Sequence, residues 1–284
     1  MLECQPVRPL MRWAGGKRWL VPHIRAIAAL WQPSSYVEPF VGGGAIFFAF
    51  EWPDATISDV NEELIAAYRG IALNPGVVAQ RLRTLRVDPE VFKRVRSWRP
   101  RRDEWRAVRL LYLNRCSYGG IYRTDRYGNY NVPFSGDRSL DSLLQNDRLE
   151  VASAALRRAQ IRSGDFESQL AGCPAGSFVF CDPAYSLPGS EVSFRRYSAP
   201  VFDWSDQCRL AEAAHSVCRE GSLVVVTNVS DPRVDSLYGG SLSIQIKRRV
   251  PFPRAGGRFV VESLHVLGER ALVRAIRVRL EEVL

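Results

Sequence analysis

The first part of the chain alternates short apolar runs with segments of helical spacing. Residues 34–38 have the pattern of a strand, and they lead into a glycine-rich stretch at residues 39–44. The pattern then predicts a helix over 45–51, a second strand over 55–58 and a capped helix over 61–68. This order of strand, glycine loop, helix and strand is typical of the opening of a doubly wound α/β domain.

The same α/β pattern returns in the second half of the chain. It predicts a strand over 160–163 and buried strands over 177–181 and 223–227, together with helices over 149–159 and 205–220. Two further stretches alternate apolar and polar residues as an antiparallel hairpin would; they are 241–248 and 259–267, with a turn at 251–257. We therefore predict an α/β fold with a doubly wound, mostly parallel sheet that ends in an antiparallel hairpin.

An insertion of different character divides this pattern. After residue 74 the chain becomes rich in arginine and helical in spacing, and residues 117–135 are rich in Gly, Tyr and Asn. We predict two domains: a discontinuous α/β domain of residues 1–70 and 151–284, and a mainly helical inserted domain of residues 71–150. A chain of 284 residues has room for one large domain with such an insertion.

The composition of the chain excludes several protein classes. Hydrophobic residues make up 46% and charged residues 24%, which excludes an intrinsically disordered chain. No apolar run approaches the roughly 18 residues of a membrane helix, and residues 1–9 carry no apolar signal segment, so we expect a cytoplasmic protein without membrane contact. The six cysteines are scattered, with no Cys-x-x-Cys pair, so we expect free thiols and no metal site.

Positive charge is concentrated in the predicted insertion. The chain has 39 Lys and Arg against 30 Asp and Glu, and 36 of the cations are arginines. Residues 71–150 hold 16 of the cations and 9 of the acids, which gives +7 of the net +9. Because the planar guanidinium suits phosphate oxygens and guanine edges, this excess indicates binding to a polyanion. A solvated helical face is the alternative.

A glycine loop follows the first predicted strand. Gly42, Gly43 and Gly44 allow the backbone to approach a ligand closely. Asp59, at the end of the next strand, is placed to accept hydrogen bonds from ribose hydroxyls. Glu38 is either an acid that meets a cationic part of a ligand or a surface acid at the end of the strand. This pattern alone fits NAD, a nucleotide, S-adenosylmethionine or a purely structural turn, and it lacks the full G-x-G-x-x-G spacing of the dehydrogenases.

A second candidate site follows the most apolar predicted strand. The segment Cys181-Asp182-Pro183-Ala184-Tyr185 puts an acid, a rigid turn and an aromatic ring where open α/β sheets bind ligands. The exocyclic amine of adenine is a poor nucleophile because its lone pair is delocalised into the ring. The Asp182 carboxylate and the Pro183 carbonyl can each accept one N–H bond and so direct the lone pair towards a methyl donor, while Tyr185 offers a stacking face. A strand-end turn with a core tyrosine is the alternative.

The order of these motifs resembles that of Dam-like DNA adenine-N6 methyltransferases. The resemblance rests on Arg12-Trp13-Ala14-Gly15-Gly16-Lys17, Tyr36-Val37-Glu38-Pro39-Phe40-Val41-Gly42-Gly43-Gly44, Ser58-Asp59-Val60-Asn61 and Cys181-Asp182-Pro183-Ala184-Tyr185. Two stretches of the insertion, 115–123 and 129–134, also resemble the DNA-reading hairpin of this family. The resemblance covers residues 12–267. It implies a site-specific, adenine-specific enzyme that transfers a methyl group from S-adenosylmethionine to N6 of a flipped adenine in double-stranded DNA.

The resemblance also implies roles for individual residues. The target base is expected against Asp182, Pro183 and Tyr185. S-adenosylmethionine is expected against Trp13, Ala14, Gly15, Lys17, Glu38, Pro39, Phe40, Gly42, Gly43, Gly44, Asp59, Asp165 and Phe166. DNA is expected against Arg99, Arg101, Arg102, Arg115, Tyr118, Arg123, Asn131, Pro133 and Arg138, with Tyr118 as a wedge in the base stack and Arg123 forked onto a guanine. The discontinuous domain is then catalytic, the insertion reads the target, and we expect a monomer with a cognate restriction endonuclease as a further partner.

Two positions depart from the pattern of the family. Ala184 stands where a second proline is usual, and Gly119 replaces an asparagine that helps some relatives to read their site. We expect activity to be retained because Asp182 and Pro183 keep the two acceptors, and we expect at least one guanine beside the target adenine. The alternatives are a catalytically silent relative, a cytosine-N4 DNA methyltransferase, and a nucleotide-dependent oxidoreductase, for which no catalytic His or Lys arrangement is visible.

Overall fold

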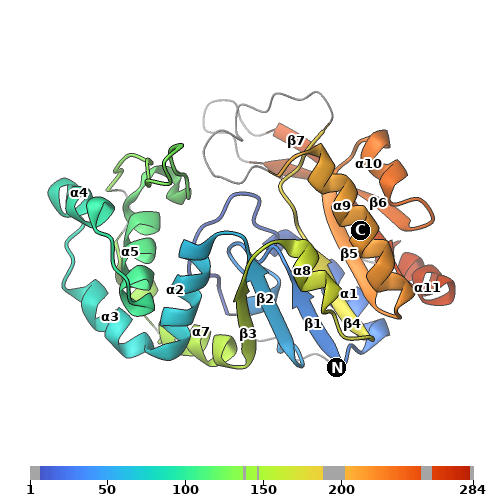
Figure 1. The fold of residues 1–284 in the computed structure, drawn as a ribbon, viewed down its shortest axis with the longest axis horizontal. Helices are drawn as coiled ribbons and strands as arrows, with labels where there is room; N and C mark the ends of the chain where they lie inside the picture. Colours follow the sequence, from blue (N-terminus) through green and yellow to red (C-terminus); the bar gives the residue numbers. More distant parts are fainter. Residues whose placement is uncertain (1–6, 137–138, 146, 188–201, 251–257, 282–284) are drawn as a thin grey trace.

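A seven-stranded sheet forms the centre of the protein (Figure 1). The computed structural model describes residues 7–136, 139–145, 147–187, 202–250 and 258–281. In sheet order the strands are β3 (Ala159–Ser163), β2 (Ala55–Asp59), β1 (Ser35–Glu38), β4 (Ser177–Cys181), β5 (Leu223–Val229), β7 (Arg258–Leu267) and β6 (Leu242–Val250). The strands from β3 to β5 run parallel, whereas β7 and β6 form an antiparallel hairpin, which confirms the predicted fold class.

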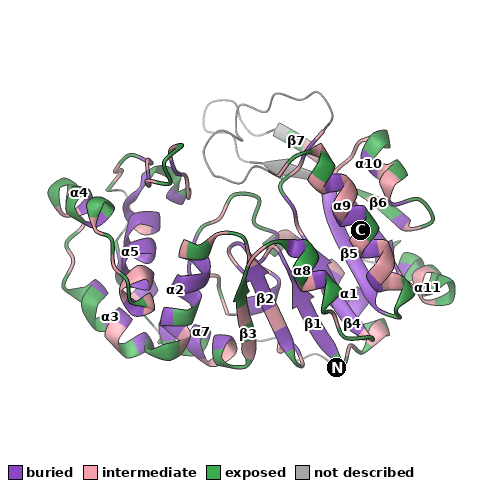
Figure 2. Ribbon diagram, viewed as in Figure 1, coloured by how far each residue is buried: buried purple, intermediate pink, exposed green. Residues whose placement is uncertain are grey.

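Helices cover both faces of this sheet. One face, which includes Tyr36 and Phe178, packs against α1 (Val21–Trp31), α2 (Glu62–Leu73) and α11 (Arg270–Glu281). The opposite face, which includes Val37 and Val179, packs against α8 (Phe166–Ala171), α9 (Trp204–Arg219) and α10 (Pro232–Leu237). Successive strand residues point to opposite faces of the sheet, and helices cover both faces. The residues of β1, β4 and β5 are therefore buried nearly throughout, as Figure 2 shows.

The helices begin where polar side chains satisfy free backbone N–H groups. Asn61 accepts hydrogen bonds from the N–H groups of Glu63 and Leu64 at the start of α2. Asp203 and Asp206 form a capping box at the start of α9. Both starts agree with the sequence pattern, although α2 continues past residue 68, where the pattern ended it.

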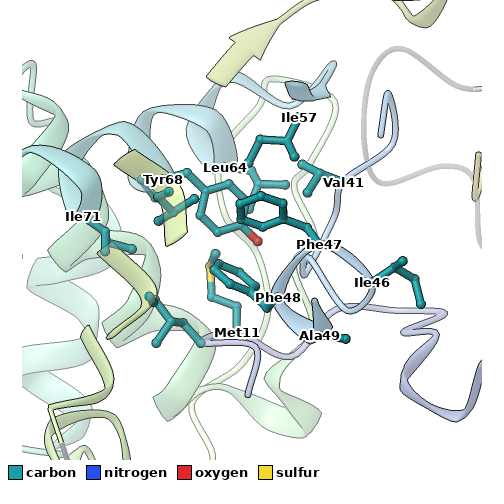
Figure 3. Packing of buried hydrophobic residues seen from close by; sticks show 14 of the residues in the cluster. Met11, Val41, Ile46, Phe47, Phe48, Ala49, Ile57, Leu64, Tyr68 and Ile71 are labelled. Atoms are coloured by element: carbon teal, nitrogen blue, oxygen red, sulfur yellow. The ribbon is translucent and has the colours of Figure 1, made fainter. Parts of the chain in front are cut away.

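The helix predicted over residues 45–51 is wrong. This stretch forms a 3-10 turn, η2 (Phe47–Ala49), which packs into the core with residues of β2 and α2 (Figure 3). Residues 46–50 are all buried. The stretch therefore has no polar face to turn towards solvent, as an amphipathic helix does. The glycine loop is consequently not followed by the N-terminus of an α-helix.

The described residues between α2 and α7 (Arg148–Arg157) form four α-helices: α3 (Pro75–Arg83), α4 (Pro89–Ser97), α5 (Asp103–Cys116) and the short α6 (Asp141–Leu144). Figure 1 shows α3, α4 and α5 as a group at one end of the molecule, beyond α2. The contact between α2 and α5 is very close, because a Cβ atom on Gly70 would lie 2.2 Å from the carbonyl oxygen of Asp103. No side chain larger than hydrogen fits at this point unless the two helices separate.

Residues 117–135, which we call the 117–135 segment, follow α5 as a loose antiparallel hairpin. Isolated bridges join Ser117 to Phe134 and Thr124 to Tyr130, and a 3-10 turn, η3 (Tyr118–Gly120), lies between them. The segment has no continuous strand ladder. Its conformation therefore depends on contacts between its own side chains and loops.

No helix within the described ranges is long and apolar enough to cross a membrane. In the same ranges no group of three or more His, Cys, Asp or Glu side chains is arranged to hold a metal ion, and the five described cysteines are free thiols.

Candidate active site

Asp182 lies at the carboxyl end of β4, in the middle of the parallel part of the sheet. Its Oδ1 atom lies 2.8 Å from the Nζ atom of Lys17 and accepts a hydrogen bond of 2.6 Å from the hydroxyl of Thr227, near the end of β5. No described residue donates to Oδ2 or to the carbonyl of Pro183. One carboxylate oxygen is therefore held in place, while the other oxygen and the adjacent carbonyl are open to a hydrogen-bond donor.

Lys17 is the centre of a buried group of charged and aromatic side chains. Its ammonium nitrogen lies 3.6 Å from Oε2 of Glu262, on β7, and 5.1 Å from the centre of the Tyr185 ring. The hydroxyl of Tyr185 donates to the same Glu262 carboxylate at 2.5 Å. We call Lys17, Asp182, Tyr185, Thr227 and Glu262 the Lys17 cluster. It joins side chains from widely separated parts of the chain around one cation.

Burial controls protonation in the Lys17 cluster. Burial raises the pKa of the Asp182 carboxyl, with a smaller contribution from Glu262, while the Lys17 ammonium and the Thr227 hydroxyl act in the opposite direction. Burial and the neighbouring carboxylates also raise the pKa of Tyr185, so its hydroxyl remains protonated and serves as a donor. Loss of the Lys17 charge would therefore raise the pKa of Asp182 further.

The sequence pattern finds only part of this cluster. It assigns Asp182 and Tyr185 to a base and Lys17 to a cofactor, whereas the structure brings the three side chains together. It misses Thr227 and Glu262. Thr227 ends a predicted apolar strand and Glu262 interrupts an apolar alternation, and a polar residue at either kind of position is a signal that could have found them.

The glycine loop after β1 is held by hydrogen bonds to its backbone. Gly42 and Gly44 have φ angles of +46° and +68°, which residues with a side chain rarely adopt. The Asp59 carboxylate accepts from the N–H groups of Gly42 at 3.0 Å and Asn61 at 2.9 Å, and the Tyr68 hydroxyl donates to the Gly42 carbonyl at 2.7 Å. Asp59 therefore shapes the loop, and its half-buried carboxylate retains lone pairs for a ligand hydroxyl.

Glu38 and an aromatic pair lie beside this loop. Glu38 is buried at the end of β1 and accepts a hydrogen bond of 2.8 Å from the Tyr36 hydroxyl, and burial raises its pKa well above the usual range. Phe40, which follows Pro39, stacks on Phe166 with the ring centres 5.3 Å apart. The structure thus brings together expected cofactor residues from the segment after β1 and from the start of α8.

Asp165 caps α8 and is held by an arginine that the sequence pattern misses. Its carboxylate accepts from the N–H group of Glu167 at 3.0 Å and pairs with Arg209 of α9 at 2.8 Å. The Arg209 guanidinium also lies 5.0 Å from the centre of the Phe166 ring. Arg209 therefore positions both Asp165 and Phe166.

The segment that carries Trp13 contacts the glycine loop and the 117–135 segment at once. The Trp13 ring stacks on Tyr122, with the ring centres 5.3 Å and the planes 18° apart. A Cβ atom on Gly42 would lie 2.8 Å from the Trp13 ring, so the loop packs directly against it. Ala14 and Gly15 follow on the surface. Tyr122 was not predicted as a site residue, and its stack connects the two halves of the candidate site.

Five of the expected DNA-binding residues lie in or beside the 117–135 segment. Tyr118 is 61% exposed, and its backbone N–H donates to the Pro133 carbonyl at 2.9 Å. Arg123 donates through Nε to the Asn131 side chain at 2.8 Å. Arg115 instead donates to the region where α6 begins. The structure therefore pairs Tyr118 with Pro133 and Arg123 with Asn131, whereas Arg115 contacts the start of α6.

The loop between α4 and α5 carries three further expected DNA-binding arginines. Arg99 donates to the side chain of Asn129 at 2.6 Å, and Arg102 pairs at 2.9 Å with a glutamate at the start of α5. Arg101 is exposed. Arg138 lies outside the described residues. Because Asn129 belongs to the 117–135 segment, the Arg99 contact holds this loop beside that segment.

A buried histidine lies on the opposite face of β7 from Glu262. The Nε2 atom of His265 lies 3.5 Å from Oδ1 of Asp235, and its ring stacks on Tyr238 at 4.6 Å. Burial lowers the pKa of His265 to about 4, so the ring is neutral near pH 7. This pair was not apparent from the sequence, and it lies on the face of the sheet that packs against α9 and α10 rather than in the Lys17 cluster.

Comparison with known proteins gives a consistent result. Residues 13–250 match the family described as D12 class N6 adenine-specific DNA methyltransferase. The chain is similar to the type II methyltransferase M1.LlaDCHI of Lactococcus lactis subsp. cremoris, with 34% identity over 82% of this chain and 84% of the relative. It is also similar to the DNA adenine methylase of Vibrio cholerae, with 28% identity over 92% of this chain and 95% of the relative. A third relative, the type II methyltransferase M.MjaIII of Methanocaldococcus jannaschii, is 30% identical over 78% of this chain and 84% of its own length.

Proposed function

The chain belongs to the D12 class of N6 adenine-specific DNA methyltransferases, and from this premise we propose the details of its reaction. It transfers a methyl group from S-adenosylmethionine to the exocyclic N6 of a flipped adenine in double-stranded DNA, at a short specific site. Residues 1–70 and 151–284 form its catalytic domain, and residues 71–150 read the target. The enzyme works in the cytoplasm as a monomer.

The observation that carries this proposal is the arrangement of acceptors at the end of β4. Oδ1 of Asp182 is fixed by Lys17 and Thr227, so Oδ2 has a defined position. The Pro183 carbonyl lies next to it on a backbone whose φ angle the proline ring restricts. An amino group with two N–H bonds requires two acceptors of this kind, and the described residues leave both of them open.

Residues around the glycine loop suit S-adenosylmethionine. The Asp59 carboxylate could accept from ribose hydroxyls, the Phe40 and Phe166 rings would offer apolar faces to an adenine, and Glu38 is a buried acid at the end of the strand that leads into the loop. When bound, the group supplies a methyl carbon on a positively charged sulfur. The chain supplies the position of the acceptor amine relative to that carbon.

Asp182 and Pro183 then act on the amine of the target base. Each acceptor holds one N–H bond, which draws the nitrogen towards a tetrahedral shape and frees its lone pair for the methyl carbon. Formation of the N–C bond would break the S–C bond of the donor and leave its sulfur as a neutral thioether. The nitrogen would then lose one N–H proton, and the Asp182 carboxylate that holds that N–H bond would accept it. Tyr185 stays protonated and anchored on Glu262, so its ring can support the base without moving.

Opening of the DNA duplex is assigned to the 117–135 segment. In this proposal the exposed Tyr118 ring fills the space that a flipped base leaves, and Arg123, which Asn131 holds, reads a guanine. Unpairing costs a few kcal/mol, which contacts to phosphates and to the stack must offset.

The decisive experiment identifies the methylated nucleoside. Purified protein is incubated with labelled S-adenosylmethionine and DNA of mixed sequence, and the DNA is digested and analysed. We expect the label on N6-methyladenine, and sequencing that maps modified bases then gives the site. Label on cytosine only, or on RNA or protein only, would contradict the proposal.

A second comparison tests whether Ala184 silences the enzyme. Ala184 is exposed and follows the two acceptors, so the Ala184→Pro variant should methylate DNA at a rate within a few-fold of the unmodified protein. Activity in Ala184→Pro combined with none in the unmodified protein would show that the natural chain binds DNA without methylating it.

A further inference from the structure

We propose that the β6–β7 hairpin is a second DNA-binding surface, which grips the duplex on the side of the active site opposite to the α3–α6 insertion. We call residues 247–250 and 258–261 the hairpin surface. The proposal rests on the proposed function, because it concerns the same DNA substrate. All the DNA-binding residues considered so far lie between residues 99 and 138, so this surface is an addition to them.

The position of the hairpin surface follows from strand direction and register. β6 runs parallel to β5, because both pair antiparallel with β7, so β6 ends at the same edge of the sheet as Asp182. Ile246 pairs with Glu262, a member of the Lys17 cluster, and Lys247 pairs with Val261. The hairpin surface therefore begins one residue beyond the cluster and extends outwards from the catalytic edge.

The sequence of the hairpin surface carries charge of one sign. Residues 247–250 and 258–261 include four cations and no acid. The described side chain of Lys247 is exposed. Because a duplex carries one negative charge for about every 1.7 Å of its axis, a cationic strand end at the catalytic edge would meet flanking phosphates.

Apolar side chains lie beside these cations. Phe259 is 60% exposed and Val261 is 39% exposed. The Lys247 ammonium lies 4.9 Å from the centre of the Phe259 ring. An exposed ring next to a cation suits sugar and phosphate together, because the ring covers the apolar part of the backbone while the cation meets the charge.

The order of the sheet places the two DNA-binding surfaces on either side of the site. The insertion attaches through α2, whose neighbours are β2 and β3 at one end of the sheet, whereas β6 is the edge strand at the other end. β1 and β4, which carry the glycine loop and Asp182, lie between them (Figure 1). A duplex laid across this edge therefore has room to contact both surfaces, one on each flank of the target base.

The test compares two variants that each lose three positive charges. The hairpin variant is Lys247→Ala/Arg249→Ala/Arg258→Ala. The control variant is Arg270→Ala/Arg274→Ala/Arg277→Ala, which removes exposed arginines from α11; that helix follows the end of β7 at the opposite edge of the sheet and packs against α1. Thermal unfolding and cofactor affinity are measured for both, to confirm that the folded catalytic domain is retained.

DNA affinity is then measured on a duplex of about 30 base pairs between about 50 and 200 mM salt. Each lost phosphate contact lowers the slope of log affinity against log salt by about 0.9, so the hairpin variant should lose roughly 2 to 3 units. The control variant should keep the slope of the unmodified protein. The KM for DNA should rise in the hairpin variant, while kcat at saturating DNA should stay within about twofold.

A single substitution separates charge from apolar contact. Phe259→Ala should lower DNA affinity several-fold at every salt concentration and leave the slope unchanged, because an apolar contact releases no counterions. An unchanged slope in the hairpin variant, or an equal loss in the control variant, would overturn the proposal. A failure of the proposed function is a separate result, since it would appear as absent methylation by the unmodified protein.

Discussion

The Lys17 cluster and the 117–135 segment are built in opposite ways. In the cluster, side chains from β4, β5, β7 and the residues before α1 meet around one buried ammonium, so almost every contact joins distant parts of the chain. In the 117–135 segment the main contacts are local: Arg123 bonds to Asn131, and Asp125 bonds to the backbone of Tyr127. The chemistry thus depends on the assembled sheet, whereas the surface that would read DNA depends mostly on its own short sequence.

The two regions are nevertheless joined at one point. Trp13 stacks on Tyr122, and the Asn114 side chain donates at 2.8 Å both to the Arg12 carbonyl and to the Gly120 carbonyl. The residues just before Lys17 are therefore held against the 117–135 segment. Substitutions in each region, and at the junction, should separate their contributions.

The largest effect is expected from the acid of the Lys17 cluster. Asp182→Ala removes one of the two acceptors for the target amine, so the rate of methyl transfer should fall by more than about 100-fold. Transfer of labelled methyl groups to DNA measures this rate. Asp182→Asn keeps an acceptor of similar shape and should retain more activity than Asp182→Ala. Equal rates for Asp182→Ala and the unmodified protein would remove Asp182 from the mechanism.

The next effect concerns stability and pH. Lys17→Met leaves the Asp182 and Glu262 carboxylates without their shared cation, so the free energy of unfolding should fall by about 3 kcal/mol. The pKa of Asp182 should also rise further, so that less of it is ionised at a given pH and the acid limb of the activity profile moves to higher pH. Denaturant unfolding and a pH–rate profile measure the two changes. An acid limb that stays in place would show that Lys17 does not govern the protonation of Asp182.

These two predictions concern a cluster that sequence reasoning reaches only in part. A short motif marks Asp182 and Tyr185 because the residues are adjacent, and a second motif marks Lys17. No local pattern states that the Lys17 ammonium pairs with Asp182, or that Glu262 supports Tyr185, because these partners are fixed only when β4, β5 and β7 align. Which side chains pair in this buried cluster is therefore decided by the assembled sheet.

The fold is more accessible to sequence reasoning. Alternation of apolar residues locates the strands, and capping residues such as Asn61 and Asp203 locate helix starts, because both signals are local. The pattern fails at residues 45–51, where apolar residues packed on all sides look helical but form only a short turn. In that stretch tertiary packing, rather than periodicity, decides the conformation.

A smaller effect is expected in the 117–135 segment. Asn131→Ala removes the side chain that holds Arg123, so discrimination at one base position should weaken by about 1 kcal/mol, or roughly fivefold. The rate at the preferred site should change little. Sequencing of modified bases in DNA from expressing cells measures the change, with Arg123→Ala as the reference for complete loss. A broad fall in rate without altered site preference would contradict a reading role for this pair.

The smallest effect is expected at the junction of the two regions. Tyr122→Leu removes the stack on Trp13, which is worth about 1 kcal/mol, so the affinity for S-adenosylmethionine should weaken several-fold. Titration calorimetry measures the affinity. Tyr127→Leu is the matched control, because Tyr127 is a 71% exposed tyrosine of the same segment without a contact to Trp13. Equal losses of S-adenosylmethionine affinity in both variants would mean that the Trp13–Tyr122 stack does not affect cofactor binding at the glycine loop.

The close approach at Gly70 has a consequence for engineering. The 117–135 segment follows directly after α5, and α5 packs tightly against α2 at the Gly70–Asp103 contact. The orientation of the segment relative to α2 is therefore fixed by this helix pair. If residues 117–135 were replaced by the corresponding residues of a relative, the new segment would keep the same orientation to the sheet. New target sequences could therefore be explored by exchanging this segment alone. A methyl group added at position 70 would push α5 away from α2 and change the orientation of any segment that follows α5.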